Sequence, residues 1–135
     1  MRFMILVKAT EDSEAGVMPP EELFAAMADY HEELTKAGVL VDANGLQASS
    51  KGWRIQYSGG KHTLLDGPFA ETKLVAGYTI IEVKSRAEAL AWSKRFPNPH
   101  MKNGEIEVRQ MFELEDFPAV EAIDRFRDMG VGAKK

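Results

Sequence analysis

The amino-terminal segment, residues 2–8, is apolar on both sides of the β-strand that its alternation predicts. Such a strand has to be covered on both faces, because exposing either face to water forfeits hydrophobic free energy. The two alternating apolar sets are Phe3, Ile5 and Val7 on one face and Met4 and Leu6 on the other. The fold must therefore provide two layers of cover for one sheet.

Two amphipathic helices are predicted, and each has its own start and stop signals. The first spans about residues 20–37: acidic residues that complement the helix dipole follow Pro20, and Gly38 ends the helix. The second begins at a capping box, in which Ser85 precedes Glu88 by three residues, and it ends before Pro97.

Alternating apolar residues and turn signals predict the strands. A Gly-Gly turn joins two of them in a hairpin, and a short C-terminal helix is expected to start at Phe117-Pro118 and stop at Gly130. The expected strands span residues 2–8, 39–46, 53–57, 62–65, 76–83 and 105–112.

This order, β-α-β, hairpin, β-α-β, predicts an α+β protein with a ferredoxin-like antiparallel sheet and an inserted β-hairpin. In that arrangement both helices cover one face of the sheet. The second cover is therefore expected to be another copy of the chain, in a two-fold homodimer that encloses a cavity. We expect one domain over residues 1–117, followed by a C-terminal helix and tail over residues 118–135.

Composition excludes several classes of function. Among its 135 residues the chain has no cysteine, which rules out disulfides, a cysteine nucleophile and thiolate metal sites. The net charge of −4, with scattered Lys and Arg, argues against nucleic-acid binding, and no segment has the roughly 20 apolar residues of a membrane helix. We expect a cytoplasmic protein.

The run Asp66-Gly67-Pro68-Phe69-Ala70-Glu71-Thr72-Lys73 closely resembles the signature of the DGPF family, part of the YCII-related group. The resemblance extends through residues 32–46, 92–100 and 104–109 and covers about residues 1–117. It implies a dimeric α/β-barrel built on the ferredoxin-like fold. It implies little about activity, since members are mostly of undetermined function, and some of their genes lie beside alternative sigma factors.

In the wider YCII-like group, a His on the first helix and an Asp on the following strand have been proposed as a catalytic pair. By counting back from Gly38, that His position falls near Met27, which cannot transfer a proton. His31 lies one helical turn further on and is not a residue-by-residue match. His31 shares the apolar arc of its helix and is expected to face the sheet, either as a core-edge side chain or as a proton carrier that needs a carboxylate partner.

The signature run contains most of the other candidates. Asp66 is interpreted either as a residue that fixes the turn before Gly67-Pro68 or as a general acid or base at the rim of a cavity. Glu71 and Lys73, two apart in an extended segment, form either a surface ion pair or a polar pair that orients a substrate. The candidate catalytic residues are Asp66, His31 and Glu71, and the candidate ligand-binding residues are Lys73, Phe69, Tyr78 and Arg109.

No cofactor is expected. The Gly59-Gly60-Lys61 run lacks the spacing of a phosphate-binding loop, and the three histidines have no metal-ligand spacing. Three functions remain open. The first is a homodimeric small-molecule-binding protein, the second a cofactor-free isomerase or lyase that uses carboxylate and histidine proton transfer, and the third an accessory factor in sigma-factor-linked transcriptional regulation.

Overall fold

The structure is a computed structural model, and it describes residues 1–100 and 102–132. Residues 133–135, the end of the expected tail, lie outside that description. In chain order the elements are β1 (Arg2–Lys8), α1 (Glu11–Glu14), α2 (Glu21–Lys36), β2 (Leu40–Gly45), η1 (Ser49–Lys51), β3 (Trp53–Ser58), β4 (Lys61–Asp66), β5 (Val75–Glu82), α3 (Arg86–Lys94), β6 (Ile106–Gln110), η2 (Leu114–Asp116) and α4 (Glu121–Asp128). Every predicted helix and strand is present, and the sequence interpretation missed α1 and the two 3₁₀ turns.

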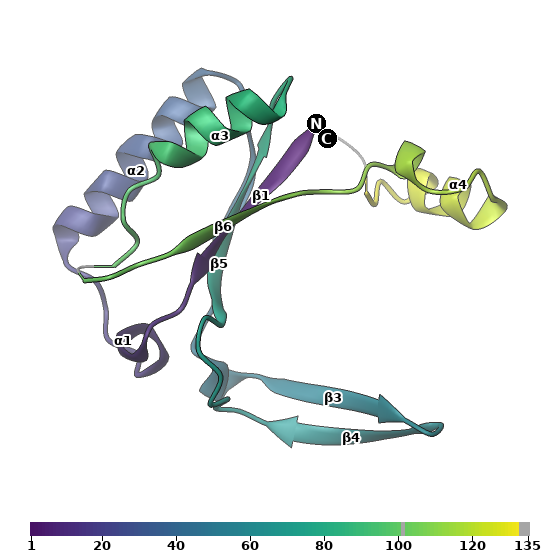
Figure 1. Cartoon of the computed structure of the whole chain (residues 1–135), viewed down its shortest axis with the longest axis horizontal. Helices are drawn as coiled ribbons and strands as arrows, with labels where there is room; N and C mark the ends of the chain where they lie inside the picture. Colours follow the sequence, from purple (N-terminus) through teal and green to yellow (C-terminus); the bar gives the residue numbers. More distant parts are fainter. Residues whose placement is uncertain (101, 133–135) are drawn as a thin grey trace.

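The main sheet has the strand order β2-β5-β1-β6, and every neighbouring pair is antiparallel. Helices α2 and α3 lie together on one face of this sheet (Figure 1). This arrangement is consistent with a ferredoxin-like fold, as the order of elements predicted. Strands β3 and β4 form a separate two-stranded sheet, the inserted hairpin.

Local signals place both helices as expected. In α2, Glu21 and Glu22 occupy the first turn and Lys36 the last, and Gly38 follows with a positive φ of 73°. In α3, the hydroxyl of Ser85 accepts a hydrogen bond from the backbone N–H of Glu88 at 3.1 Å. These caps satisfy donors and acceptors that the helix ends leave without intrahelical partners.

The core lies between the two helices and the sheet. Leu34 of α2, Ile5 of β1 and Ile81 of β5 are fully buried there. Burying side chains of this kind contributes about 1.5–3 kcal/mol each relative to exposure. The other core residues are Phe3, Tyr30, Val39, Val83 and Ala89.

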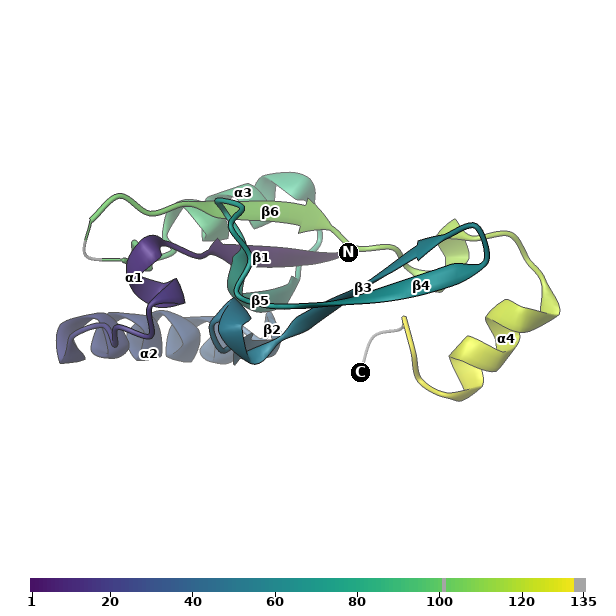
Figure 2. The same cartoon turned by 90° about the horizontal axis from the view of Figure 1, so that it is seen from below.

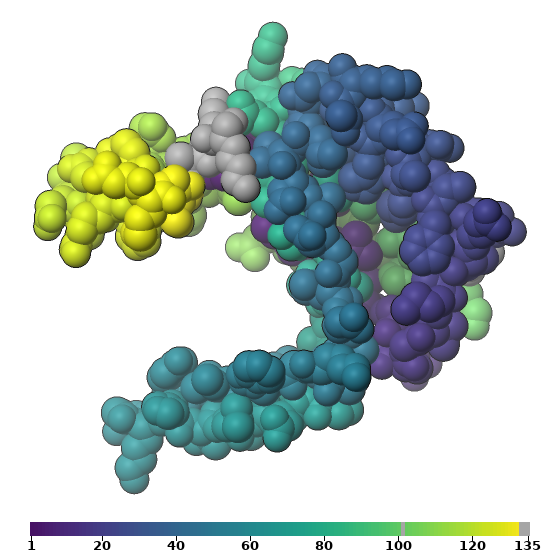
Figure 3. Space-filling model, turned by 180° about the vertical axis from the view of Figure 1, so that it is seen from behind, coloured from purple at the N-terminus to yellow at the C-terminus, as the bar shows by residue number. Residues whose placement is uncertain are grey.

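None of the helices in residues 1–100 and 102–132 covers the opposite face of the sheet. Met4 and Leu6 point to this face, as the alternation predicted, and are half-buried together with Ile80 of β5. Two arms extend from the body beside this face, the β3–β4 hairpin and the C-terminal segment with α4 (Figures 1 and 2). The space-filling view shows the hollow between the two arms (Figure 3).

Candidate functional site

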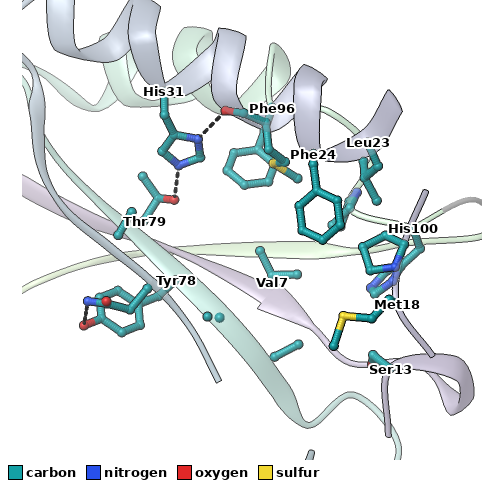
Figure 4. A pocket seen from close by; sticks show the side chains of 18 of the residues that line it. Val7, Ser13, Met18, Leu23, Phe24, His31, Tyr78, Thr79, Phe96 and His100 are labelled. Carbon is teal, nitrogen blue, oxygen red and sulfur yellow. Dashed lines mark hydrogen bonds between the residues drawn. The ribbon is translucent and has the colours of Figure 1, made fainter. Parts of the chain in front are cut away.

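A pocket opens between the N-terminal half of α2 and the end of the sheet where β1 stops and β5 begins. Its volume is about 550 Å³. Three connecting segments complete its walls: α1, the stretch leading into α2, and the loop after α3. Met27 belongs to its apolar lining. So do five residues labelled in Figure 4, namely Val7, Met18, Leu23, Phe24 and Phe96.

The pocket exists because the sheet changes from large to small side chains along its length. Phe3, Ile5 and Ile81 fill the space beneath the helices at one end. At the other end the helix-facing positions hold Ala43 and Gly77, which leave that space open. The hollow is thus a consequence of small side chains at helix-facing positions of two neighbouring strands, β2 and β5.

His31 projects from α2 toward the sheet and meets Thr79 of β5 inside this pocket (Figure 4). Its Nδ1 lies 2.7 Å from the carbonyl oxygen of Met27, and its Nε2 lies 2.8 Å from the Thr79 hydroxyl oxygen. A carbonyl oxygen only accepts, so Nδ1 carries a proton and donates it. In the neutral imidazole, Nε2 therefore accepts from the Thr79 hydroxyl.

Aromatic side chains hold the imidazole in this orientation. The ring of Tyr30 lies edge-on to it at 5.5 Å between centroids, and that of Phe96 at 6.1 Å. Both ring nitrogens are bonded, and neither partner is a carboxylate. The prediction that His31 faces the sheet is confirmed by these contacts.

A second histidine reaches the pocket from the loop before β6. The Nε2 of His100 lies 2.7 Å from the backbone carbonyl of Lys8 and donates to it. Asp12 and Ser13 of α1 also line the pocket, and Ser13 is tied to Thr10 through the cap of that short helix. Polar groups of α1, α2, β5 and the loop before β6 therefore converge on a mostly apolar hollow.

Tyr78 also borders this pocket, but its ring lies on the other side of β5 from Thr79 (Figure 4). Successive side chains of a strand point to opposite faces, which accounts for the separation. The Tyr78 hydroxyl accepts from the Asn44 amide at 3.0 Å and donates to Asp42 at 3.3 Å. This hydrogen-bonded group belongs to the face that carries no helix.

The signature run lies at the base of the β3–β4 hairpin, away from the residues that line the pocket. Asp66 ends β4, where it pairs with Trp53, and is exposed. Glu71 accepts from Arg54 of β3 at 2.6 Å, and the Arg54 guanidinium stacks 3.7 Å above the ring of Phe69. The hydrogen bond from Arg54 is the main cause that lowers the pKa of Glu71 below its ordinary value.

The same run ties the hairpin to the body of the protein. The backbone N–H of Gly67 donates to the carbonyl of Gly52 at 3.0 Å, and that of Phe69 donates to the Ser49 hydroxyl at 3.0 Å. Glu14 of α1 in turn accepts from the backbone N–H of Ser49 at 2.8 Å and from its hydroxyl. A chain of hydrogen bonds thus links α1, η1 and the hairpin base.

Two further candidates make ion pairs at the surface. Lys73 pairs with Glu105 at 3.0 Å rather than with Glu71. Arg109 lies 3.8 Å from Glu107, which also pairs with Lys8 at 3.0 Å. The Lys8 hydrogen bond is the main cause that lowers the pKa of Glu107. The exposed pairs of Lys73 with Glu105 and of Arg109 with Glu107 are worth at most about 1 kcal/mol each.

Comparison with known proteins assigns the family. A model of the YCII-related domain matches residues 1–115. The chain belongs to the YCII-related family. An uncharacterized protein of Rhizobium meliloti (strain 1021) is 28% identical to this YCII-related chain over 92 residues, which are 67% of this chain and 74% of that protein.

Of the seven residues that the sequence singled out, the YCII-related fold brings His31 and Tyr78 to the pocket from opposite sides of β5, and it gathers Asp66, Phe69 and Glu71 at the hairpin base. Lys73 and Arg109 lie in surface ion pairs. The catalytic and ligand-binding roles of these residues stay predictions.

Thr79 and His100 line the pocket but were not predicted. Thr79 had a readable signal: it is the polar member of the alternating set Gly77, Thr79, Ile81 and Val83, which faces the helices. A buried hydroxyl on an apolar strand face needs a partner, and here that partner is His31. His100 lacked such a signal, because its position depends on the path of a proline-rich loop.

Within residues 1–100 and 102–132, no group of three or more His, Asp or Glu side chains is arranged to hold a metal ion. Over the same residues, none of the helices combines the length and apolar character needed to cross a membrane.

Proposed function

We propose that this YCII-related chain, of the DGPF type, binds a small and largely apolar molecule in the pocket beneath α2. The observation that carries the proposal is a hollow of about 550 Å³ with apolar walls and the His31–Thr79 pair at the sheet. Ligand sites in proteins are typically hollows of roughly 300–1,000 Å³ that combine apolar walls with a few polar groups. Met18 and Phe24, which are 77% and 55% exposed, offer apolar surface at the mouth.

A substitution that fills the pocket tests this function. Ala28 lies on α2 and lines the pocket, whereas Ala25 is an exposed residue of the same helix outside the lining. With methoxynaphthalene as an apolar probe, we expect Ala28→Trp to weaken binding at least about tenfold, because the indole occupies the ligand's space. Ala25→Trp adds the same side chain and should leave binding unchanged.

Isothermal titration calorimetry measures both variants, and circular dichroism checks that they fold. Equal binding by the two variants would place the probe elsewhere on the surface. Failure of the wild-type chain to bind the probe up to its solubility limit would contradict the proposed function itself.

A proton-transfer enzyme is the second candidate, and the hydrogen bond between the His31 imidazole and the Thr79 hydroxyl favours it, because imidazole is the side chain that most often transfers protons in enzymes. A proton would pass between the substrate and Nε2 of His31 through the Thr79 hydroxyl, whose oxygen lies 2.8 Å from Nε2. The test uses tetralone, an aromatic ketone with exchangeable α-hydrogens, in deuterated water. Exchange that the wild-type chain accelerates and His31→Gln does not would support the enzyme; equal exchange with and without protein would exclude it for this class of ketone.

We further propose that the chain acts as a homodimer whose two copies meet through the helix-free faces of their sheets. Half-buried Met4, Leu6 and Ile80 form an apolar centre there, bordered by charged Glu107 and Arg109 of β6. An apolar centre with a polar rim is the usual anatomy of a protein interface.

The exposed apolar side chains of the β3–β4 hairpin also support a homodimer. All six residues of β4 are exposed, and in β3 the side chains of Trp53 and Tyr57 are 64% and 79% exposed. A two-stranded hairpin alone is at best marginally stable in water, so its apolar side chains need cover. A second copy supplies that cover symmetrically, since each copy offers both an arm and an open face.

The dimer is tested by the molar mass of the protein, measured by light scattering during size-exclusion chromatography. We expect twice the chain mass at micromolar concentration. A monomer with an intact fold would contradict the dimer.

A dimer that binds a further protein through α4, whose Phe126 and Met129 are 42% and 64% exposed, would instead favour the regulatory alternative.

A further inference from the structure

We infer that Thr79 is the side chain that contacts the polar atom of the ligand, and that this ligand is an aromatic compound bearing a hydroxyl group, of the phenol or naphthol class. The inference rests on the proposed function and names the chemistry of the molecule that fills the pocket. It comes from the hydrogen-bond directions at the sheet, from the charges around the pocket and from the aromatic residues in its walls.

The Thr79 hydroxyl can accept a hydrogen bond from a ligand while it donates its own proton to His31. Neutral His31 donates from Nδ1 to the Met27 carbonyl at 2.7 Å, so its Nε2 can only accept. The Thr79 hydroxyl, 2.8 Å away, must then donate its single proton to Nε2. Its oxygen retains acceptor capacity, which a hydrogen-bond donor can use if the ligand reaches the floor of the pocket, where Thr79 is 2% exposed.

The charge of the pocket also favours a neutral ligand. Asp12 is the one Asp, Glu, Lys or Arg among the described residues that line the pocket, and it is exposed. An anionic ligand would have no fixed cation among these residues to offset the loss of its hydration. A neutral donor, such as an aromatic hydroxyl, meets the Thr79 oxygen without that cost.

The walls of the pocket contain aromatic side chains. Phe24 and Phe96 line the pocket, and Phe96 also packs edge-on against the imidazole of His31. Aromatic rings prefer edge-on or offset contacts with other rings, so a flat ring suits this lining. The geometry therefore favours a planar body with its hydroxyl directed at the sheet.

The experiment compares naphthol with methoxynaphthalene, which has the same ring system but no donor. By titration calorimetry at pH 8, we expect Thr79→Val to weaken naphthol binding about tenfold, the value of one hydrogen bond of about 1.4 kcal/mol. Methoxynaphthalene binding should not change, and Thr79→Ser should restore naphthol binding. Thr35→Val is the matched control, because it removes a hydroxyl that bonds the His31 carbonyl at 2.8 Å from outside the pocket.

Each outcome decides between the two proposals. Equal naphthol affinity of folded Thr79→Val and wild-type chains would overturn the inference while leaving the pocket function intact. Loss of naphthol binding in His31→Gln but not in Thr79→Val would show that the ligand contacts His31 directly, which also overturns it. Absence of binding by both naphthalene probes in the wild-type chain would overturn the proposed function and the inference together.

Discussion

At the scale of single residues, the signature run can pack at the hairpin base because Gly67 has no side chain. A Cβ at Gly67 would overlap the carbonyl group of Ser49, which the hairpin base approaches closely. The same region carries the hydrogen bonds from Gly67 to Gly52 and from Phe69 to Ser49. Glycine is required here by contact with another backbone segment, which a residue pattern alone does not reveal.

Gly67→Ala should therefore destabilise the protein, by about 1–3 kcal/mol, because the added methyl group forces two backbone segments apart. Gly52→Ala is the matched control, since a Cβ there lies 3.7 Å from the same Ser49 carbonyl oxygen, an ordinary contact. Urea unfolding followed by circular dichroism measures both. Equal stability of the two variants would mean that the hairpin base can shift without cost.

At the scale of elements, Tyr30 joins the two helices that cover the sheet. It is 4% exposed, its hydroxyl donates to the Trp92 carbonyl of α3 at 2.8 Å, and its ring packs edge-on to Phe96 at 5.1 Å. Burial raises the pKa of Tyr30 from 10.0 to about 12, because the charged phenolate is poorly solvated there. The contact thus couples the packing of α2 on α3 to alkaline pH.

A raised pKa means that the folded state holds this proton more tightly than the unfolded state does. The stabilisation is complete below pH 10 and is lost as pH rises toward about 12. We expect the wild-type chain to lose between about 1 and 3 kcal/mol over this interval that Tyr30→Phe does not lose. Urea unfolding at several alkaline pH values measures the difference.

Tyr57→Phe provides the comparison for this effect, because Tyr57 lies in β3 and is 79% exposed. The free energy of unfolding of Tyr57→Phe should fall with rising alkaline pH as that of the wild-type chain does. If Tyr30→Phe lost stability as steeply as the wild-type chain, the alkaline transition would have to be assigned to other groups.

At the scale of the whole molecule, helices cover one face of the sheet, and the other face is open between the two arms. The helix-covered side contains the core and the pocket, whereas the other side shows the hollow between two arms (Figure 3). The C-terminal arm is attached through Arg2, which is 6% exposed and pairs with Glu113 at 3.0 Å. The body thus holds the root of this arm in place and leaves the apolar surface further along it exposed.

A charge in the middle of the helix-free face should prevent the proposed dimer. Ile80→Asp places a carboxylate at the apolar centre, and burying it without a partner costs several kcal/mol, so we expect dimer affinity to fall at least about 100-fold. Ala91→Asp puts the same charge on exposed α3 and should leave the dimer intact. Analytical ultracentrifugation over a dilution series measures both.

The melting temperature offers a second view of the same prediction. If folding and association are linked, the wild-type melting temperature rises with protein concentration, and that of Ile80→Asp does not. A folded Ile80→Asp chain that dimerises like the wild type would contradict the proposed interface.

Much of the architecture could be read from local patterns. The proline before α2, the Ser85–Glu88 cap of α3 and the Gly-Gly turn between β3 and β4 all lie where predicted. The helix-facing position of His31 also followed from helical spacing. The place of the signature run directly after the hairpin also followed from the order of strands. Its contacts did not, because the hydrogen-bond partners Ser49 and Gly52 lie outside the run in an irregular stretch.

The sequence by itself determined the order of the elements, the helix caps and the presence of a strand that is apolar on both faces. These features follow from near-neighbour sterics, side-chain alternation and hydrogen bonds within a few residues. Only the tertiary structure decided that His31 meets Thr79, 48 residues away, and that small residues of β2 and β5 leave a pocket beside them. That outcome depends on strand register and on the volumes of distant side chains, which no local pattern contains.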